Sequence, residues 1–136
     1  NNKKFNSELR VNNYKILNNG LGLDIKLKSM CKSCYLCEKT NESVVHLFIE
    51  CEKTKRLFEE NKVNFFKNQI LNYERNSVLY HINLEHETSR LMSIFKLSIW
   101  KLRNLIKKNT SGYDLKCYKR HTDICAPTVA RHVNYV

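Results

Sequence analysis

The strongest pattern of apolar and polar positions lies between residues 86 and 108. On a helical wheel, nine positions of this segment share one arc of about 160°, typical of a core-facing helix. They are Leu91, Met92, Ile94, Phe95, Ser98, Ile99, Leu102, Leu105 and Ile106. Five basic residues lie on the other side of the wheel: Lys96, Lys101, Arg103, Lys107 and Lys108. The spacing predicts a long amphipathic helix that stops at Gly112.

Weaker helical patterns precede this segment. Apolar residues recur at helical spacing over residues 5–19 and 52–67. The short apolar run within 42–50 could be strand or helix by composition, and we predict a helix because helical spacing continues after it. Gly20 and Gly22 follow the first of these segments and are expected to end its helix. We therefore predict three shorter helices before the long one.

The remaining segments carry less periodicity. Residues 69–85 are mixed and predict a short helix and a loop, whereas residues 113–136 have no periodicity and predict an irregular tail. The chain of 136 residues contains three Gly and one Pro, so turns are scarce. This scarcity favours helices over long strands, and the predicted fold is a small, mainly α domain.

The charge of the chain adds a first indication of a partner. The formal net charge is +11, and residues 61–136 hold 13 Lys and Arg against five Asp and Glu. Such an excess suits a polyanion such as nucleic acid, although a solvated helix face would show the same excess.

No apolar window approaches the ~20 residues that a membrane-spanning helix needs. There is also no apolar segment of a signal peptide. We therefore expect an intracellular protein without a membrane partner. The first residue, Asn1, suggests a fragment of a longer protein.

Four of the six cysteines crowd between residues 31 and 51 beside a histidine. Cys34, Cys37, His46 and Cys51 follow the pattern C-x2-C-x8-H-x4-C. Two residues between cysteines allow a tight turn to aim both sulfurs at one tetrahedral zinc ion. Three thiolates and one imidazole fill the coordination shell, so the predicted Zn²⁺ is structural rather than catalytic. Cys31 leaves a second register open, because Cys31 and Cys34 have the same spacing, and buried free thiols are the alternative for the whole cluster.

Several motifs resemble a known family at this point. They are Tyr14-Lys15-Ile16-Leu17, Gly20-Leu21-Gly22-Leu23, His46-Leu47-Phe48-Ile49-Glu50-Cys51 and Ile99-Trp100-Lys101-Leu102-Arg103. With the upstream cysteines, they resemble the zinc-binding domain downstream of the reverse transcriptase in non-LTR, LINE-like retrotransposon polyproteins. The resemblance covers about residues 9–108, and it departs from the family at Glu52, where Pro is frequent.

The resemblance implies Cys34, Cys37, His46 and Cys51 as the zinc ligands. It also implies an accessory module that contacts RNA or DNA during target-primed reverse transcription, with the parent reverse transcriptase as partner. Accordingly, we expect a zinc-binding domain over residues 5–67, a helical extension over 68–112 and the tail over 113–136.

The chain is expected to be a binding module rather than an enzyme. It has three Asp and no Asp-Asp pair, whereas a polymerase needs clustered carboxylates to hold two metal ions. No small-molecule substrate is expected. In the tail, Cys117, His121, Cys125 and His132 match no tight metal-binding spacing, and we interpret them as incidental.

Two hypotheses concern the basic helix. In the first, Lys96, Lys101, Arg103, Lys107 and Lys108 contact phosphate while Trp100 stacks on an unpaired base. In the second, the zinc only folds a helical scaffold, and the face that carries Trp100 packs on the polymerase or another protein. A degenerate element without a selected function is a third possibility.

Overall fold

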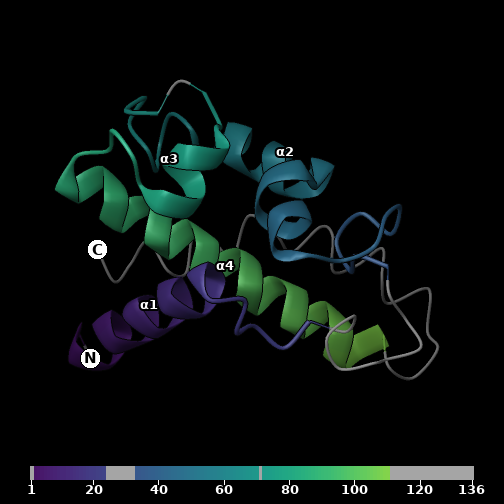
Figure 1. Cartoon of the computed structure of the whole chain (residues 1–136). Coiled ribbons are helices and arrows are strands. Elements are labelled where there is room, and N and C mark those ends of the chain that lie inside the picture. The colour runs from purple at the N-terminus through teal and green to yellow at the C-terminus, as the bar shows by residue number, and fades with distance from the viewer. Residues whose placement is uncertain (1, 24–32, 71, 111–136) are drawn as a thin grey trace.

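The computed structural model describes residues 2–23, 33–70 and 72–110. Figure 1 shows the helices in these ranges, which are α1 (Asn2–Leu17), η1 (His46–Glu50), α2 (Glu52–Asn61), α3 (Arg75–Tyr80) and α4 (His86–Thr110). The predicted mainly α fold is confirmed, and between Ser33 and Asn41 the described residues add one isolated antiparallel bridge. None of the described helices is long and apolar enough to cross a membrane. Cys31 and the predicted tail lie outside the described ranges.

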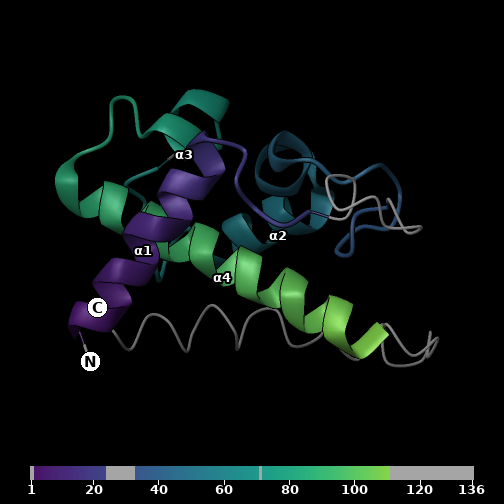
Figure 2. The ribbon, with the colours of Figure 1, turned by 60° about the horizontal axis from the view of Figure 1, so that its bottom comes forward.

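The long helix α4 runs through the middle of the structure. Figures 1 and 2 show α1 lying across one side of α4, while α2 and α3 lie along the other side. The end of α1 also meets α3, and η1 packs against both α2 and α3. Every residue from Leu91 to Ile99 is consequently buried. The prediction of a helix with one continuous polar face is wrong for this stretch, because neighbouring elements cover it all round.

Aromatic side chains fill the space between α4 and α2. Phe95 of α4 packs on Phe58 of α2, with ring centroids 6.3 Å apart, and on Phe66, at 5.6 Å. Tyr73 adds a third contact to Phe95 at 6.2 Å. Each such pair adds about 0.5–1.5 kcal/mol beyond the burial of its apolar area. This cluster joins residues on both sides of the predicted boundary at 67/68 in one hydrophobic core.

The first helix ends by a mechanism that differs from the predicted one. Asn19, rather than Gly20, adopts the left-handed conformation, with φ of 52°. The N–H of Gly20 then donates to the carbonyl of Lys15 at 2.7 Å, and the N–H of Asn18 donates to Tyr14 at 3.0 Å. Asparagine tolerates this conformation better than most residues, so it can terminate a helix as glycine does.

The second half of the predicted helix 52–67 is also different. α2 ends at Asn61, and residues 62–68 form successive turns. Lys67 and Asn68 have positive φ values of 52° and 57°. These turns swing Phe65 and Phe66 into the core, so their helix-like spacing reflects burial rather than helical structure. The short helix predicted within 69–85 corresponds to α3.

Candidate metal centre

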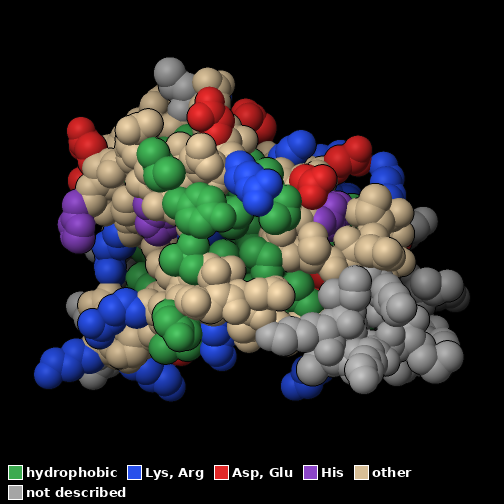
Figure 3. Space-filling model, in the orientation of Figure 1, with side chains coloured by type: hydrophobic (Ala, Val, Ile, Leu, Met, Phe, Trp, Pro, Cys, Tyr) green, Lys and Arg blue, Asp and Glu red, His purple; other side chains and the backbone are tan. Residues whose placement is uncertain are grey.

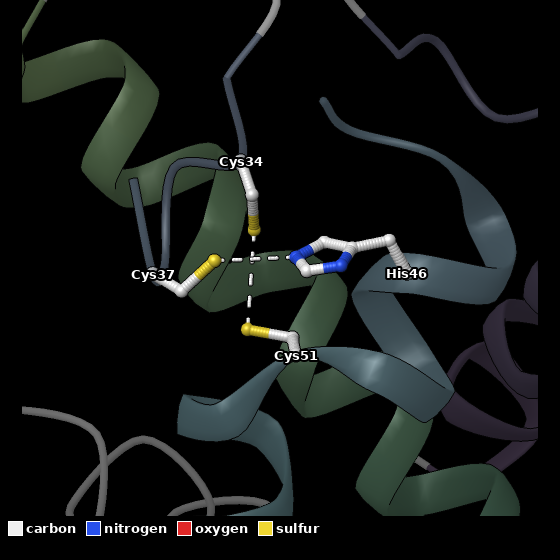
Figure 4. A group of neighbouring side chains, drawn as sticks. All are labelled: Cys34, Cys37, His46 and Cys51. Carbon is white, nitrogen blue, oxygen red and sulfur yellow. Dashed lines mark hydrogen bonds between the residues drawn. The ribbon is translucent and has the colours of Figure 1, made fainter. Parts of the chain in front are cut away.

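Four side chains from the 33–41 loop and from the two ends of η1 converge in the structure. Cys34, Cys37, His46 and Cys51 point toward one another (Figure 4), and their ligand atoms all lie within 4.8 Å of one another. The sulfurs of Cys34 and Cys51 are 3.9 Å apart, and the sulfur of Cys37 is 3.2 Å from Nε2 of His46. Among the described residues, no other group of Cys, His, Asp and Glu comes together in this way.

A short loop over residues 33–41 supplies the first two sulfurs. The N–H of Cys34 donates to the carbonyl of Thr40 at 2.8 Å, and the N–H of Glu38 donates to the carbonyl of Cys34 at 2.9 Å. Glu38 takes a left-handed conformation with φ of 61°, which closes the turn after Cys37. The loop thereby holds both thiols on its inner side, as a C-x2-C turn requires.

The π-helix η1 places the other two ligands on one side. In an α-helix, His46 and Cys51 would lie about 140° apart around the axis. Here the N–H of Cys51 donates to the carbonyl of His46 at 2.7 Å, so five residues close one wider turn. The wider turn brings both side chains to the same point. An α-helix was predicted for 42–50, and the alignment of these two ligands explains the difference.

Side chains support the ends of this π-turn. The hydroxyl of Ser43 accepts from the N–H of His46, the first residue of η1, at 2.9 Å. At its end, the buried hydroxyl of Thr54 donates to the carbonyl of Leu47 at 2.8 Å. The hydroxyl of Tyr73 donates to the carbonyl of Phe48 at 2.5 Å. Carbonyls that the irregular turn leaves without a helical donor are thus satisfied inside the core.

The centre is mostly shielded from solvent. Cys34, His46 and Cys51 are buried and Cys37 is half-buried. A hydrogen bond from Cys34 lowers the pKa of the Cys51 thiol to about 5, and the same bond and burial raise the pKa of Cys34. The pair therefore favours one thiolate at neutral pH, which is the form that binds metal. Nδ1 of His46 lies 3.0 Å from the hydroxyl of Thr40, which can fix the ring orientation.

This donor set can hold one metal ion in a closed shell. Three sulfurs and one ring nitrogen provide four ligands, so a tetrahedral ion would have no position left for water or substrate. The ligands predicted from the sequence are the residues that the structure brings together. Scans against protein-family models, curated proteins and solved structures gave no match. The resemblance to the retrotransposon zinc-binding domain therefore remains a prediction from the sequence motifs.

Two of the residues predicted to contact phosphate are not at the surface. Lys96 and Arg103 are each 1% exposed. Lys96 falls in the stretch of α4 that is covered all round, and burial lowers its pKa to about 7. Arg103 forms a buried ion pair with Glu42, whose oxygens accept from its Nε and Nη2. The prediction that Lys96 and Arg103 contact phosphate at the surface is therefore wrong. A helical wheel of α4 alone cannot show which other elements pack against the helix.

The other predicted contact residues lie farther toward the surface. Lys101 and Lys108 are exposed, and Trp100 and Lys107 are half-buried. Nζ of Lys101 lies 2.9 Å from a carboxylate oxygen of Glu8 in α1, which joins the two helices at their surface.

Sequence reasoning missed the basic character of α1. Its exposed basic side chains outnumber the single acid of the helix, Glu8, and they are Lys3, Lys4, Arg10 and Lys15. A charge count over the helix alone would have found this signal, which a count over residues 1–60 dilutes with the acids of the cysteine loop and α2. Glu42 was missed as well. It directly follows the 33–41 loop and is buried, whereas Glu38 within the loop is exposed.

Proposed function

We propose that the cysteine–histidine centre binds one structural Zn²⁺. The observation that carries this proposal is the convergence of Cys34, Cys37, His46 and Cys51 inside the hydrophobic core. Two sulfurs on a tetrahedral zinc ion would be separated by about 3.8 Å, from Zn–S bonds of ~2.3 Å. The sulfurs of Cys34 and Cys51 are 3.9 Å apart before any ion is considered. Thiolate and imidazole ligands together select zinc over harder cations such as magnesium.

The zinc acts here as a folding element. Its ligands come from the 33–41 loop and from both ends of η1, and Cys51 immediately precedes α2. One ion would therefore join the loop to η1 and to the start of α2. Binding to such a site contributes directly to the free energy of folding. We assign no catalytic role to this chain.

We further propose that the zinc-folded domain contacts nucleic acid. The exposed cations of α1, together with Lys101, Lys107 and Lys108 near the end of α4, provide the basic surface. This surface replaces the predicted face of α4 alone. The sequence motifs shared with retrotransposon polyproteins support an accessory role beside a parent reverse transcriptase. Phosphate contacts of this kind release counterions, so the affinity should fall linearly with salt on a logarithmic scale.

A salt titration tests this proposal directly. The affinity of the full chain for labelled RNA and DNA is measured by fluorescence anisotropy at several salt concentrations. Each lost phosphate contact should reduce the steepness of the plot of log affinity against log salt concentration by about 0.7–0.9. Lys15→Ala in α1 is expected to weaken binding and to make the salt dependence less steep. Lys55→Ala is the control, because Lys55 is an exposed residue of α2 and its loss changes the charge by the same amount. A flat slope for the unaltered chain, or no binding, would overturn the proposal.

One observation favours a second candidate, a docking module for another protein. Figure 3 shows hydrophobic side chains gathered on one face over α3 and the end of α1. Leu17 and Tyr80 are about half exposed there, at 53% and 52%. They border a hollow of about 280 Å³ that Val44, Leu79 and Arg75 also line. Exposed apolar groups rimmed by polar ones are typical of protein contacts.

The two candidates can be separated by substituting this face. Leu17→Ser with Tyr80→Ser should abolish association with the polymerase part of a parent protein under the docking hypothesis. The same double variant should leave the affinity for RNA and DNA unchanged, since neither residue belongs to the basic surface. Unchanged protein association, measured by size-exclusion chromatography of the two components, would exclude this face as the docking site.

A further inference from the structure

A groove separates α1 from α4 on the basic side of the domain. Its volume is about 450 Å³, and its lining includes Lys4, Glu8, Asn12, Lys15, Trp100 and Lys101. Small-molecule and nucleotide sites usually enclose 300–1,000 Å³, so this groove is large enough for one nucleotide unit. It lies away from the four cysteine and histidine ligands, none of which lines it.

The floor of the groove contains an unusual polar residue. Phe5, Leu9, Asn12 and Ile16 form the buried stripe of α1, at the spacing of one helix face. Asn12 is the polar member of this stripe and is only 4% exposed. Among the described residues, its amide nitrogen has no hydrogen-bond partner. A buried donor without an acceptor costs stability, so a ligand that supplies an acceptor would explain why an amide stands here.

The wall opposite α1 carries the only tryptophan of the chain. Trp100 is half-buried, and the guanidinium of Arg103 lies 4.9 Å from its ring centroid. The ion pair with Glu42 fixes Arg103, so the guanidinium packs on one face of the Trp100 ring as a rigid group. A ring held in this way is pre-organised for stacking, because little side-chain freedom is lost when a second planar group arrives.

Charged groups surround the mouth of the groove. Lys4 and Lys15 contribute positive charge from α1, and Lys101 contributes it from α4. Glu8 neutralises part of this charge through its ion pair with Lys101 at 2.9 Å. The remaining excess is positive and suits the phosphates on either side of a nucleotide. A planar ring, a buried amide donor and flanking cations together match the base and phosphates of one nucleotide.

From this arrangement we infer that the groove binds one unpaired nucleotide of a single-stranded nucleic acid. The base stacks on Trp100, a base carbonyl or ring nitrogen accepts from the Asn12 amide, and Lys4 and Lys15 contact phosphates. The inference rests on the proposed nucleic-acid binding and narrows it to single strands. A base inside a duplex is stacked on both faces and paired with its partner along one edge, so it cannot enter the groove while it stays in the helix.

The test uses the fluorescence of Trp100, which reports on the groove alone because the chain has one tryptophan. The full chain is titrated with single-stranded oligothymidylate and oligouridylate of about ten nucleotides, and with a duplex of equal length. Both single strands should quench the emission, and the duplex should not.

Two variants sharpen the test. Asn12→Leu should reduce the affinity for single strands about tenfold, as expected for one lost hydrogen bond, yet leave the melting temperature equal or higher. Asn13→Leu is the matched control. The neighbouring Asn13 amide donates to the hydroxyl of Ser93 at 2.8 Å and does not line the groove, so its loss should not change affinity.

The outcomes separate this inference from the broader proposal. Salt-dependent binding with equal affinity for single strands and duplex, or without quenching of Trp100, would overturn the inference and leave nucleic-acid binding standing. Unchanged affinity of Asn12→Leu would overturn it too. Failure to bind any of the three probes would overturn both.

Discussion

The guanidinium of Arg103 in α4 and the carboxylate of Glu42, directly after the 33–41 loop, form a two-point ion pair inside the protein. Nε of Arg103 donates to Oε2 of Glu42 at 3.0 Å, and Nη2 donates to Oε1 at 2.5 Å. The side chains are 2% and 0% exposed. The pair connects the loop that supplies two candidate metal ligands to the central helix. The pair therefore ties the packing of α4 to the position of the loop that holds Cys34 and Cys37.

Breaking this pair on one side should be strongly destabilising. Arg103→Met leaves the carboxylate of Glu42 buried without its guanidinium partner, and we expect a loss of about 3–5 kcal/mol in the free energy of unfolding. Glu42→Met together with Arg103→Met removes both charges and should recover most of that loss. Urea denaturation of the two variants and the wild type measures the difference. A double variant no more stable than Arg103→Met would contradict this account.

The contact between Arg103 and Tyr35 leads to a smaller effect. The ring centroid of Tyr35 lies 4.9 Å from the guanidinium carbon, and Trp100 lies at the same distance. Tyr35→Leu should cost about 1–2 kcal/mol, the range for partly desolvated cation–π contacts. Tyr35→Phe keeps the ring and serves as the control. If both substitutions lower the urea midpoint equally, the hydroxyl rather than the ring stabilises the loop.

How far the sequence predicts this fold depends on the element. The 86–108 pattern located α4 to within two residues at each end, since apolar spacing over many turns is a strong signal. The same pattern misjudged Lys96 and Arg103, because a wheel describes one helix and not the elements that cover it. The π-turn at His46 was missed for a related reason. Nothing in local spacing distinguishes it from an α-helix, and its geometry depends on where Cys34 and Cys37 lie.

The candidate metal centre was easier to predict than the surface around it. Metal ligands carry specific chemistry at specific spacing, so the spacing located the cluster but left the register with Cys31 open. The family resemblance then selected Cys34, Cys37, His46 and Cys51. The groove could not, because Asn12 and Trp100 are 88 positions apart and meet only through the crossing of α1 and α4. Its one local trace in the sequence is the polar Asn12 within an otherwise apolar helix stripe.

Metal analysis should find one zinc per chain, with a ligand set that mutations can define. Cys37→Ser removes one thiolate and should abolish stoichiometric zinc and lower the melting temperature sharply, because metal binding and folding are linked. Cys31→Ser should keep the metal, since the other four side chains already complete the shell. Mass spectrometry under native conditions and a thermal melt report both properties. Zinc lost from Cys31→Ser and kept by Cys37→Ser would assign the other register.

The buried Lys96 gives the domain a pH dependence that can be measured. Burial lowers the pKa of Lys96 from 10.5 to about 7. Burial and the nearby charge of Lys96 together lower the pKa of His81 to about 4. Between pH 7 and pH 10.5 the unfolded chain therefore binds more protons at Lys96 than the folded chain does. Stability contributed by this group rises with pH across that window and is lowest below pH 7.

Lys96→Met removes this penalty while keeping a long unbranched side chain. The variant should be more stable than the wild type at pH 7 by roughly 3–5 kcal/mol, from a pKa shift of several units at about 1.4 kcal/mol each. The gap should shrink toward zero as the pH approaches 10.5, the usual pKa of lysine. Urea denaturation of both proteins at half-unit steps from pH 7 to 10 measures the difference in their free energies of unfolding. The titration of the thiols contributes equally to both proteins and cancels in this difference. The exposed Lys55→Met is the control and should show no such trend. A gap that stays constant with pH would mean that Lys96 keeps its charge in the folded domain through an interaction that offsets its burial.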